Sequence, residues 1–584
     1  MSCLTDLGRH FRRHGTDVKR PRGGALRRLA GPARPPAAKA RSPSPFARVQ
    51  DKGSSIVAPV RATIDMGELV TMPTMNALAA EDKFVLACLI VVVLLFLLRA
   101  IFARLVTDDK AKEDPFKEYL LASQELTPRD VRESTAATFS AFATVFFWFV
   151  ALGGMYSWVL LLIPLFLVIG NFLFTKVVAR YGVRLVDHIT IGTFVRSRSA
   201  YAPLHYLADF IVAVFLFSAL LVELIIGSGI IASMLPLPGM QFVLLLVLSL
   251  IVILYVAIGG FRAVVLSDTI QLYLTFGGVA ALVIFAIFYL KPSSSATALL
   301  YKPDISFFEL LAFVVSVITV QTLGPLCQLQ NWQRISASKD QDAALRAHRH
   351  GALIGAGLWV VMILAALLLY SKLAGSVNIN AILTQMKQHG VFPGYALYPL
   401  VMVGFVAAML STADSALAAI HLLVYDNLRR KTKTADKPFR LRFKHHLVLG
   451  AILLLIIVAI YYLNQTRIKD FSIATIYFLY NQLQVVFPVL FYFVVETVVR
   501  RDETLVRKLA DHRRTVSRIL AVALVLGWLV VVVMSAIGYF TPSLNWIMFA
   551  SAGGVATSGL VSLYAWHILW KVWRGRQSQA EPAP

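Results

Sequence analysis

Long apolar stretches alternate with short polar segments along most of the chain. Two examples are FVLACLIVVVLLFLL at residues 84–98 and ILAVALVLGWLVVVVMSAIGYF at residues 519–540. A helical run of about 20 apolar residues is long enough to cross the hydrocarbon core of a bilayer. The pattern predicts thirteen membrane-spanning helices, near residues 84–104, 136–156, 158–179, 202–233, 240–259, 267–290, 306–329, 350–372, 396–426, 446–463, 472–498, 517–539 and 545–571.

The composition agrees with this pattern. Of the 584 residues, 58% are hydrophobic and 15% are charged, whereas a soluble domain carries about 25% charged residues. The three cysteines are scattered, so neither a disulfide framework nor a zinc spacing is present. The loops contain no nucleophile–base set and no phosphate-binding loop, so we expect neither an enzyme nor an ATP-driven pump.

The charge of the loops orients the predicted spans. Strongly basic loops follow the third, seventh, ninth and eleventh spans, while the links SMLPLPGMQ and GYFTPSLNW carry no charge. Cytoplasmic loops carry the excess of Lys and Arg. We therefore expect a multi-pass protein integral to the plasma (bacterial inner) membrane, with the N-terminus outside and the C-terminus cytoplasmic.

The first 61 residues conflict with this orientation. They hold fourteen Lys and Arg against three Asp, and such a segment resists translocation. Residues 1–75 have the composition of a disordered tail, or translation starts at Met66, Met72 or Met75 and the tail is not made. Few aromatic side chains are available there for base stacking, so no nucleic acid is expected as a partner.

Three polar motifs interrupt the apolar pattern. They are GGFRAVVLSDTIQLYL at residues 259–274, CQLQNWQRISASKD at residues 327–340, and MLSTADS at residues 409–415, followed by Tyr425 and Asp426. Taken alone, Asp268 could be an acid favoured by a helix N-terminus. Arg334 alone could be a snorkelling side chain at a helix end.

Together and in this order, the three motifs resemble the sodium:solute symporter family over about residues 115–499, and the first motif resembles its sodium/proline branch most closely. The resemblance implies an all-α, LeuT-like fold with an inverted repeat of five plus five helices and alternating access. The parts would be an extra N-terminal helix at 84–104, the repeats at 136–290 and 306–498, two C-terminal helices at 517–571 and a cytoplasmic tail at 572–584.

The resemblance also implies a sodium site. Hydroxyls and free backbone carbonyls solvate a dehydrated cation with a smaller desolvation cost than fixed charges. The implied ligands are the hydroxyls of Ser411 and Thr412 and the carbonyls of Ala408, Ser140 and Ala143. The alternative is that the two hydroxyls bond back to the preceding helical turn. The span at 136–156 would be the broken helix, with Gly153–Gly154 as its weak point.

Three acids lie within the predicted spans. Asp268 matches a family acid that helps sodium to leave towards the cytoplasm. Asp414 either attracts cations or forms a buried pair with a cytoplasmic-side arginine, since intramembrane acids do both. Glu223 matches no family residue and could belong to a cation path.

Departures from the family bear on the substrate. Phe142 and Phe147 stand where family members carry polar side chains, which disfavours a sugar. We expect both phenylalanines to line the substrate site together with Gln321, Tyr480 and Asn481. For these three polar residues the alternative is interhelical hydrogen bonding. We therefore expect Na⁺-coupled symport of a small polar organic solute, such as proline or another amino acid, or a short carboxylate. The alternatives are H⁺ coupling and a solute sensor that works with a separate signalling chain.

Overall fold

The computed structural model describes residues 80–181, 183–234, 240–290, 305–372, 379–388, 394–432, 443–466, 481–501, 503–541 and 544–580. All of these residues belong to one compact unit, Pro59–Pro584. The predicted tail at residues 1–75 and the last four residues lie outside the described part of the chain.

The described part is helical throughout, and its only β pairing is an isolated bridge between Leu126 and Ser338. The elements are α3 (Ala80–Glu113), α4 (Pro115–Leu121), η4 (Ala122–Gln124), α5 (Pro128–Phe139), α6 (Phe142–Tyr156), η5 (Ser157–Leu161), α7 (Leu162–Tyr181), η6 (Leu185–Asp187), α8 (Ile191–Arg198), α9 (Ala202–Met234), α10 (Met240–Phe288), α11 (Phe307–Cys327), α12 (Leu329–Ser336), α13 (Gln341–Lys372), α14 (Ile379–Gln388), α15 (Gly394–Thr432), α16 (Phe443–Thr466), η8 (Asn481–Val485), α18 (Val486–Arg501), α19 (Glu503–Phe540) and α20 (Leu544–Ala580).

Ten segments of the described residues are long and apolar enough to cross a membrane. Two of them, Val145–Tyr181 and Met240–Phe288, each take up two of the predicted spans. The predicted span at 472–498 is represented by the shorter apolar helix Leu483–Val495. The chain is thus an all-helical, multi-pass membrane protein, as its hydropathy pattern predicts.

The predicted span at 136–156 is broken, but not at the glycines. Helix α5 ends at Phe139, and α6 begins after Ser140 and Ala141, whose backbone angles are not helical. Gly153 and Gly154 lie inside α6, where a side chain on Gly154 would collide with Tyr370 of α13. Gly154 therefore permits close helix packing, and the assignment of Gly153–Gly154 as the weak point is wrong.

The connection predicted between the spans at 240–259 and 267–290 is a kink at Gly260. Two helical stretches of α10 meet there, and only Gly260 leaves the helical conformation, with φ 60° and ψ −162°. A Cβ on Gly260 would lie 2.6 Å from the carbonyl oxygen of Tyr119. Glycine is required here both for the positive φ and for this close approach.

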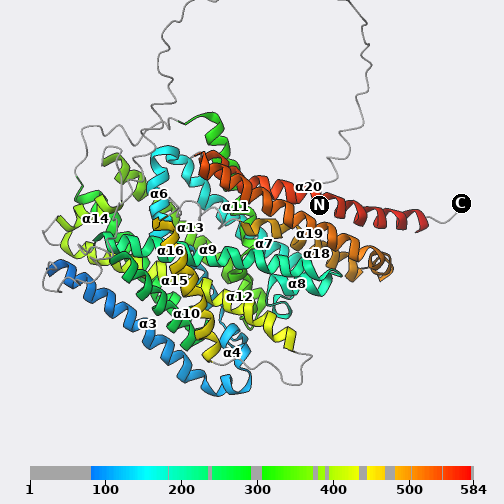
Figure 1. The fold of residues 1–584 in the computed structure, drawn as a ribbon, viewed down its shortest axis with the longest axis horizontal. Helices are drawn as coiled ribbons and strands as arrows, with labels where there is room; N and C mark the ends of the chain where they lie inside the picture. The colour runs from blue at the N-terminus through cyan, green and yellow to red at the C-terminus, as the bar shows by residue number, and fades with distance from the viewer. Residues whose placement is uncertain are drawn as a thin grey trace, which may run out of the picture. The chain divides into compact units, whose positions relative to one another are not determined.

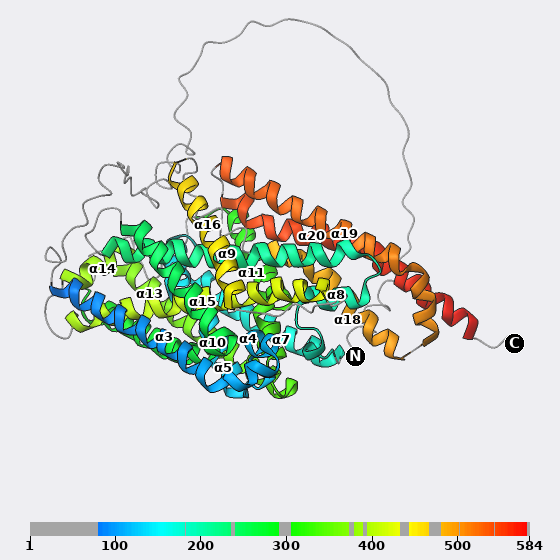
Figure 2. The same ribbon diagram turned by 60° about the horizontal axis from the view of Figure 1, so that its bottom comes forward.

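Several of the helices that pack together are far apart in the sequence (Figure 1). Helix α10 runs along α15, and α5 packs between α10 and α13. The last two helices, α19 and α20, lie side by side in both ribbon views (Figure 2). Contacts of α15 with α10 and with α12 bring the three polar motifs together.

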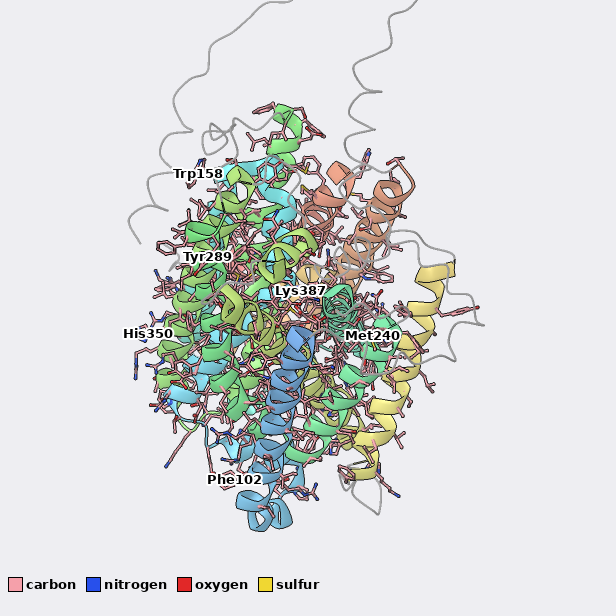
Figure 3. All side chains as sticks on the ribbon, turned by 90° about the vertical axis from the view of Figure 1, so that its left-hand side faces the viewer. Phe102, Trp158, Met240, Tyr289, His350 and Lys387 are labelled. Carbon is pink, nitrogen blue, oxygen red and sulfur yellow. The ribbon has the colours of Figure 1, made fainter. Side chains whose placement is uncertain are left out.

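Helix α3 packs along α10 and is tied to the short helix α14 by an ion pair. Lys387 of α14 lies close to the start of α3 (Figure 3). Its Nζ donates to both carboxylate oxygens of Asp82, at 2.7 Å each. Asp82 is buried, whereas the Lys387 side chain keeps 27% of its surface exposed.

Candidate functional site

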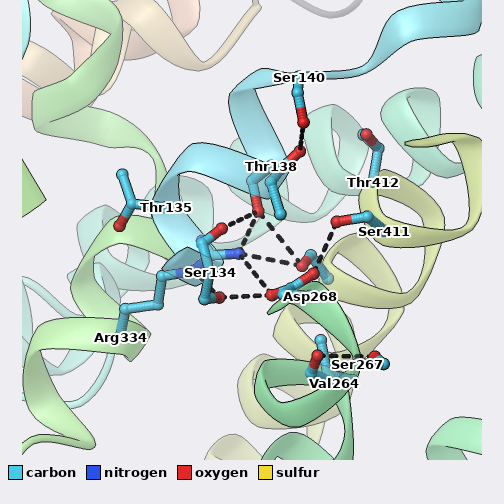
Figure 4. A network of polar contacts seen from close by, with 12 residues as sticks. Ser134, Thr135, Thr138, Ser140, Val264, Ser267, Asp268, Arg334, Ser411 and Thr412 are labelled. Atoms are coloured by element: carbon cyan, nitrogen blue, oxygen red, sulfur yellow. Dashed lines mark hydrogen bonds and ion pairs between the residues drawn. The ribbon is translucent and has the colours of Figure 1, made fainter. Parts of the chain in front are cut away.

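A buried carboxylate, Asp268 of α10, stands at the centre of a network of hydroxyl groups (Figure 4). Ser134 of α5 donates to its Oδ2 at 2.5 Å, and Ser411 of α15 donates to its Oδ1 at 2.6 Å. Asp268 lies two turns beyond the kink at Gly260, inside the helix. It is therefore not the helix-terminal charge that the sequence alone allows.

Arg334 of α12 completes the network. Its Nε donates to Ser134 Oγ at 2.7 Å, and its Nη2 donates to Ser415 Oγ at 3.0 Å and to Thr138 Oγ1. The same Nη2 lies 3.9 Å from Asp268 Oδ2, and the arginine side chain is 1% exposed. The interpretation of Arg334 as a snorkelling residue at a helix end is wrong.

A second helix break directs Arg334 inward. Helix α11 ends at Cys327, and α12 starts after Gln328, which has an extended backbone. The carbonyls freed at the end of α11 accept hydrogen bonds from α12 side chains: Asn331 Nδ2 donates to Pro325 O at 3.4 Å, and Trp332 Nε1 donates to Leu326 O at 3.0 Å. These bonds fold α12 back into the protein, so its polar residues are buried.

The adjacent hydroxyls of α15 have different partners. Ser411 bonds to Asp268, whereas Thr412 Oγ1 donates back to the carbonyl of Ala408 at 3.3 Å. Ser140, at the break of the first repeat, lies in the same region (Figure 4), and its Oγ donates to Ala137 O at 2.6 Å. Ala143 lies in the first turn of α6. All five predicted sodium ligands therefore lie on two elements, the α5–α6 break and α15.

Asp414 is buried beside this network. Neither carboxylate oxygen has a hydrogen bond of good geometry within the described residues. Its polar neighbours include the Gln271 side chain and the Ser415 backbone. Arg334 also interacts electrostatically with Asp414, but its ion pair is with Asp268. Two carboxylates and one guanidinium leave one negative charge in excess when both acids are ionised, a costly arrangement away from water unless a cation compensates it.

The predicted substrate residues are described only in part. Gln321 is half-buried in α11, at the point where Gly170 of α7 meets its backbone carbonyl. Phe147 is half-buried and packs edge-to-face on Trp148. The side chains of Phe142 and Asn481, and all of Tyr480, lie outside the described part. Glu223 is buried within α9.

Two members of the network, Ser134 and Thr138, lie outside the three motifs and have no distinguishing sequence context. Hydroxyls in helices commonly bond back one turn, and Thr138 does so by donating to Ser134 O at 3.1 Å. The spacing of Ser134 and Thr138, four residues apart on one helix face, is the only local signal for them.

Comparison with known proteins identifies a family whose sequence profile this chain matches. The sequence profile of the sodium:solute symporter family matches residues 119–474, more than half of the chain. None of the curated proteins matches this sequence. A solved Na⁺-coupled sialic acid symporter in a substrate-bound outward-open state is similar over 83% of this chain and 98% of its own, at 13% identity and TM-score 0.60. A structure of MhsT in complex with L-phenylalanine covers 74% and 98%, at 16% identity and TM-score 0.42.

Proposed function

The chain belongs to the sodium:solute symporter family, and we propose that it takes up a small polar organic solute together with Na⁺. Sodium-coupled solute symport follows from the family, and the LeuT-like fold of the similar symporter agrees with it. The solute class we propose is an amino acid such as proline, or a short carboxylate. The motif at residues 259–274 supports the proline branch, and Phe147 in place of a polar residue argues against a sugar.

The proposed sodium site lies between the break of α5–α6 and α15. The hydroxyls of Ser411 and Thr412 and the carbonyls of Ala408, Ser140 and Ala143 are its ligands. The position of the Ser411–Thr412 pair, beside a helix break and beside the buried carboxyl groups of Asp268 and Asp414, carries this proposal. A broken helix leaves carbonyls without intrahelical partners, and such carbonyls coordinate cations in transporters of this architecture.

Asp268 and Asp414 form the proposed path by which sodium leaves towards the cytoplasm. Ser411 belongs to the proposed site and also donates to Asp268, so one hydroxyl connects the two. An ion that leaves Thr412 can remain in contact with Ser411 while it approaches Asp268. Arg334 already pairs with that carboxylate, so it opposes a second cation and keeps the path closed at its inner end.

We also propose the membrane orientation derived from the loops, with the N-terminus outside and the C-terminus cytoplasmic. Helix α3 would be the additional helix before the repeats, and α19 and α20 the two helices after them. Large apolar side chains on α3 are exposed, among them Leu98 and Leu105. Membrane lipid is the partner that such a surface fits.

The choice of coupling ion gives a direct test of the proposed function. We expect the purified full-length protein, reconstituted into liposomes, to accumulate one solute from a radiolabelled panel of amino acids and short carboxylates under an inward Na⁺ gradient. A pH gradient without Na⁺ should drive no accumulation. Uptake that persists without Na⁺ and disappears in Asp414→Asn or Glu223→Gln would instead make the protein an H⁺ symporter.

Gln321 tests the substrate site. A buried polar group of the solute that loses its partner is disfavoured by about 1–3 kcal/mol. We therefore expect Gln321→Ala to raise the apparent substrate constant about tenfold, with unchanged Na⁺ affinity in the absence of substrate. Gln241→Ala is the matched control, because Gln241 donates across to the Ile225 carbonyl of α9. Equal behaviour of the two variants would make Gln321 an interhelical contact.

A further inference from the structure

One face of α13 packs against α5. His348, Gly351, Gly355 and Trp359 are spaced by three, four and four residues, so they lie on the same side of α13. A Cβ on Gly351 would lie 2.5 Å from the carbonyl oxygen of Arg132, and one on Gly355 would lie 2.7 Å from Phe139 Cβ. The two helices therefore approach closely between His348 and Trp359.

His348 makes a polar contact with each of two helices. It is fully buried, its Nε2 lies 2.8 Å from Asn171 Oδ1 of α7, and its Nδ1 lies 3.2 Å from Thr135 Oγ1 of α5. Asn171 Nδ2 donates to the Leu167 carbonyl at 2.8 Å, which leaves Oδ1 as the acceptor facing the histidine. Nε2 therefore carries a proton and donates to Asn171, and in the neutral ring Thr135 donates to Nδ1.

Thr135 is next to Ser134 in the helix that meets Asp268. Ser134 and Thr138 face Asp268 and Arg334, while Thr135 faces α13. Because a helix is stiff over three turns, fixing Thr135 also fixes the rotation and height of Ser134 and Thr138. At the other end of α5, Trp359 Nε1 donates to the carbonyl of Phe139, the last residue before the break.

We propose that His348 is a positioning residue for the sodium site. Through Thr135 it sets the register of α5, and thereby the place of the Ser140 carbonyl and of the Ser134–Asp268 contact opposite Ser411 and Thr412. The inference rests on the proposed sodium site. Ligands that are held in place before the ion arrives bind it more tightly, because less ordering accompanies binding.

The test is ²²Na⁺ binding to the purified full-length protein in detergent, together with its midpoint of thermal unfolding. His348→Leu and Thr135→Val should each raise the sodium dissociation constant about fivefold to tenfold, the loss expected for one buried hydrogen bond. The double variant should bind no more weakly than the weaker single variant, because both remove the same contact. His348→Gln retains a donor and an acceptor and should stay within about threefold of wild type.

His446→Leu is the matched control. His446 is a buried histidine of α16, and its ring contacts within the described residues are with Tyr119, His421 and Tyr425, away from α5. The substitution should lower the unfolding midpoint without changing sodium affinity.

The outcomes separate this role from the sodium site itself. Normal sodium binding by His348→Leu and Thr135→Val, with weakened binding by Thr412→Ala, would overturn the role of His348 and leave the sodium site intact. Normal binding by Thr412→Ala, or none by wild type, would overturn the site and this role with it.

Discussion

Asp268→Leu should destabilise the protein more than any other single substitution in the polar network. Arg334 would keep its charge in a place where its side chain is 1% exposed. Removing one partner of a buried ion pair costs about 3–5 kcal/mol, because the other charge is left uncompensated. We expect a large fall in the thermal unfolding midpoint of the purified protein and no sodium-driven uptake.

Two further variants separate charge from packing in this result. The double variant Asp268→Leu/Arg334→Met should recover most of the lost stability, since apolar pairs replace buried ion pairs with little cost. It should still fail to transport. Asp82→Leu is the matched control: Asp82 is equally buried, but its partner Lys387 is 27% exposed and can remain hydrated. If Asp268→Leu is no more harmful than Asp82→Leu, the charge of Arg334 is not what holds the network together.

The membrane-spanning helices can be predicted from the sequence because the requirements for a span are local. A membrane span must satisfy its own backbone groups and be apolar over about 20 residues, and both requirements are visible in a short window. The connection between the two spans that form α10 is shorter than the sequence predicts, for a reason that is not local. It is a kink at Gly260, where the Tyr119 carbonyl, far away in sequence, approaches the chain.

Only those residues of the polar network that are polar within an apolar stretch of sequence can be predicted from the sequence. Asp268, Asp414 and the Ser411–Thr412 pair are conspicuous because apolar residues surround them. Ser134 and Thr138 are ordinary helix residues, and their importance depends on which helix faces meet. The burial of Arg334 follows from the break at Gln328 and the return of α12 into the protein, which no short window of sequence shows.

Thr412→Ala should raise the half-saturating Na⁺ concentration at least tenfold with little loss of stability. Among the described residues its hydroxyl makes a single long bond, 3.3 Å, to the carbonyl one turn earlier, so removing it costs the sodium-free protein little. A contact to a charged group is worth about 1.5–3 kcal/mol, and about 1.4 kcal/mol corresponds to a factor of ten. Thr412→Ser keeps the hydroxyl and should bind Na⁺ as wild type does.

Ser411→Ala should differ from Thr412→Ala in a way that only the structure predicts. Ser411 donates to Asp268 at 2.6 Å, so its removal weakens sodium binding and also leaves one oxygen of a buried carboxylate without its donor. We expect a similar rise in half-saturating Na⁺ but a lower unfolding midpoint, measured by ²²Na⁺ binding and thermal unfolding on the same preparations. Unchanged sodium dependence in Thr412→Ala would remove Thr412 from the site. Equal stability of the two variants would contradict the bond between Ser411 and Asp268, and with it the connection between the sodium site and the path to the cytoplasm.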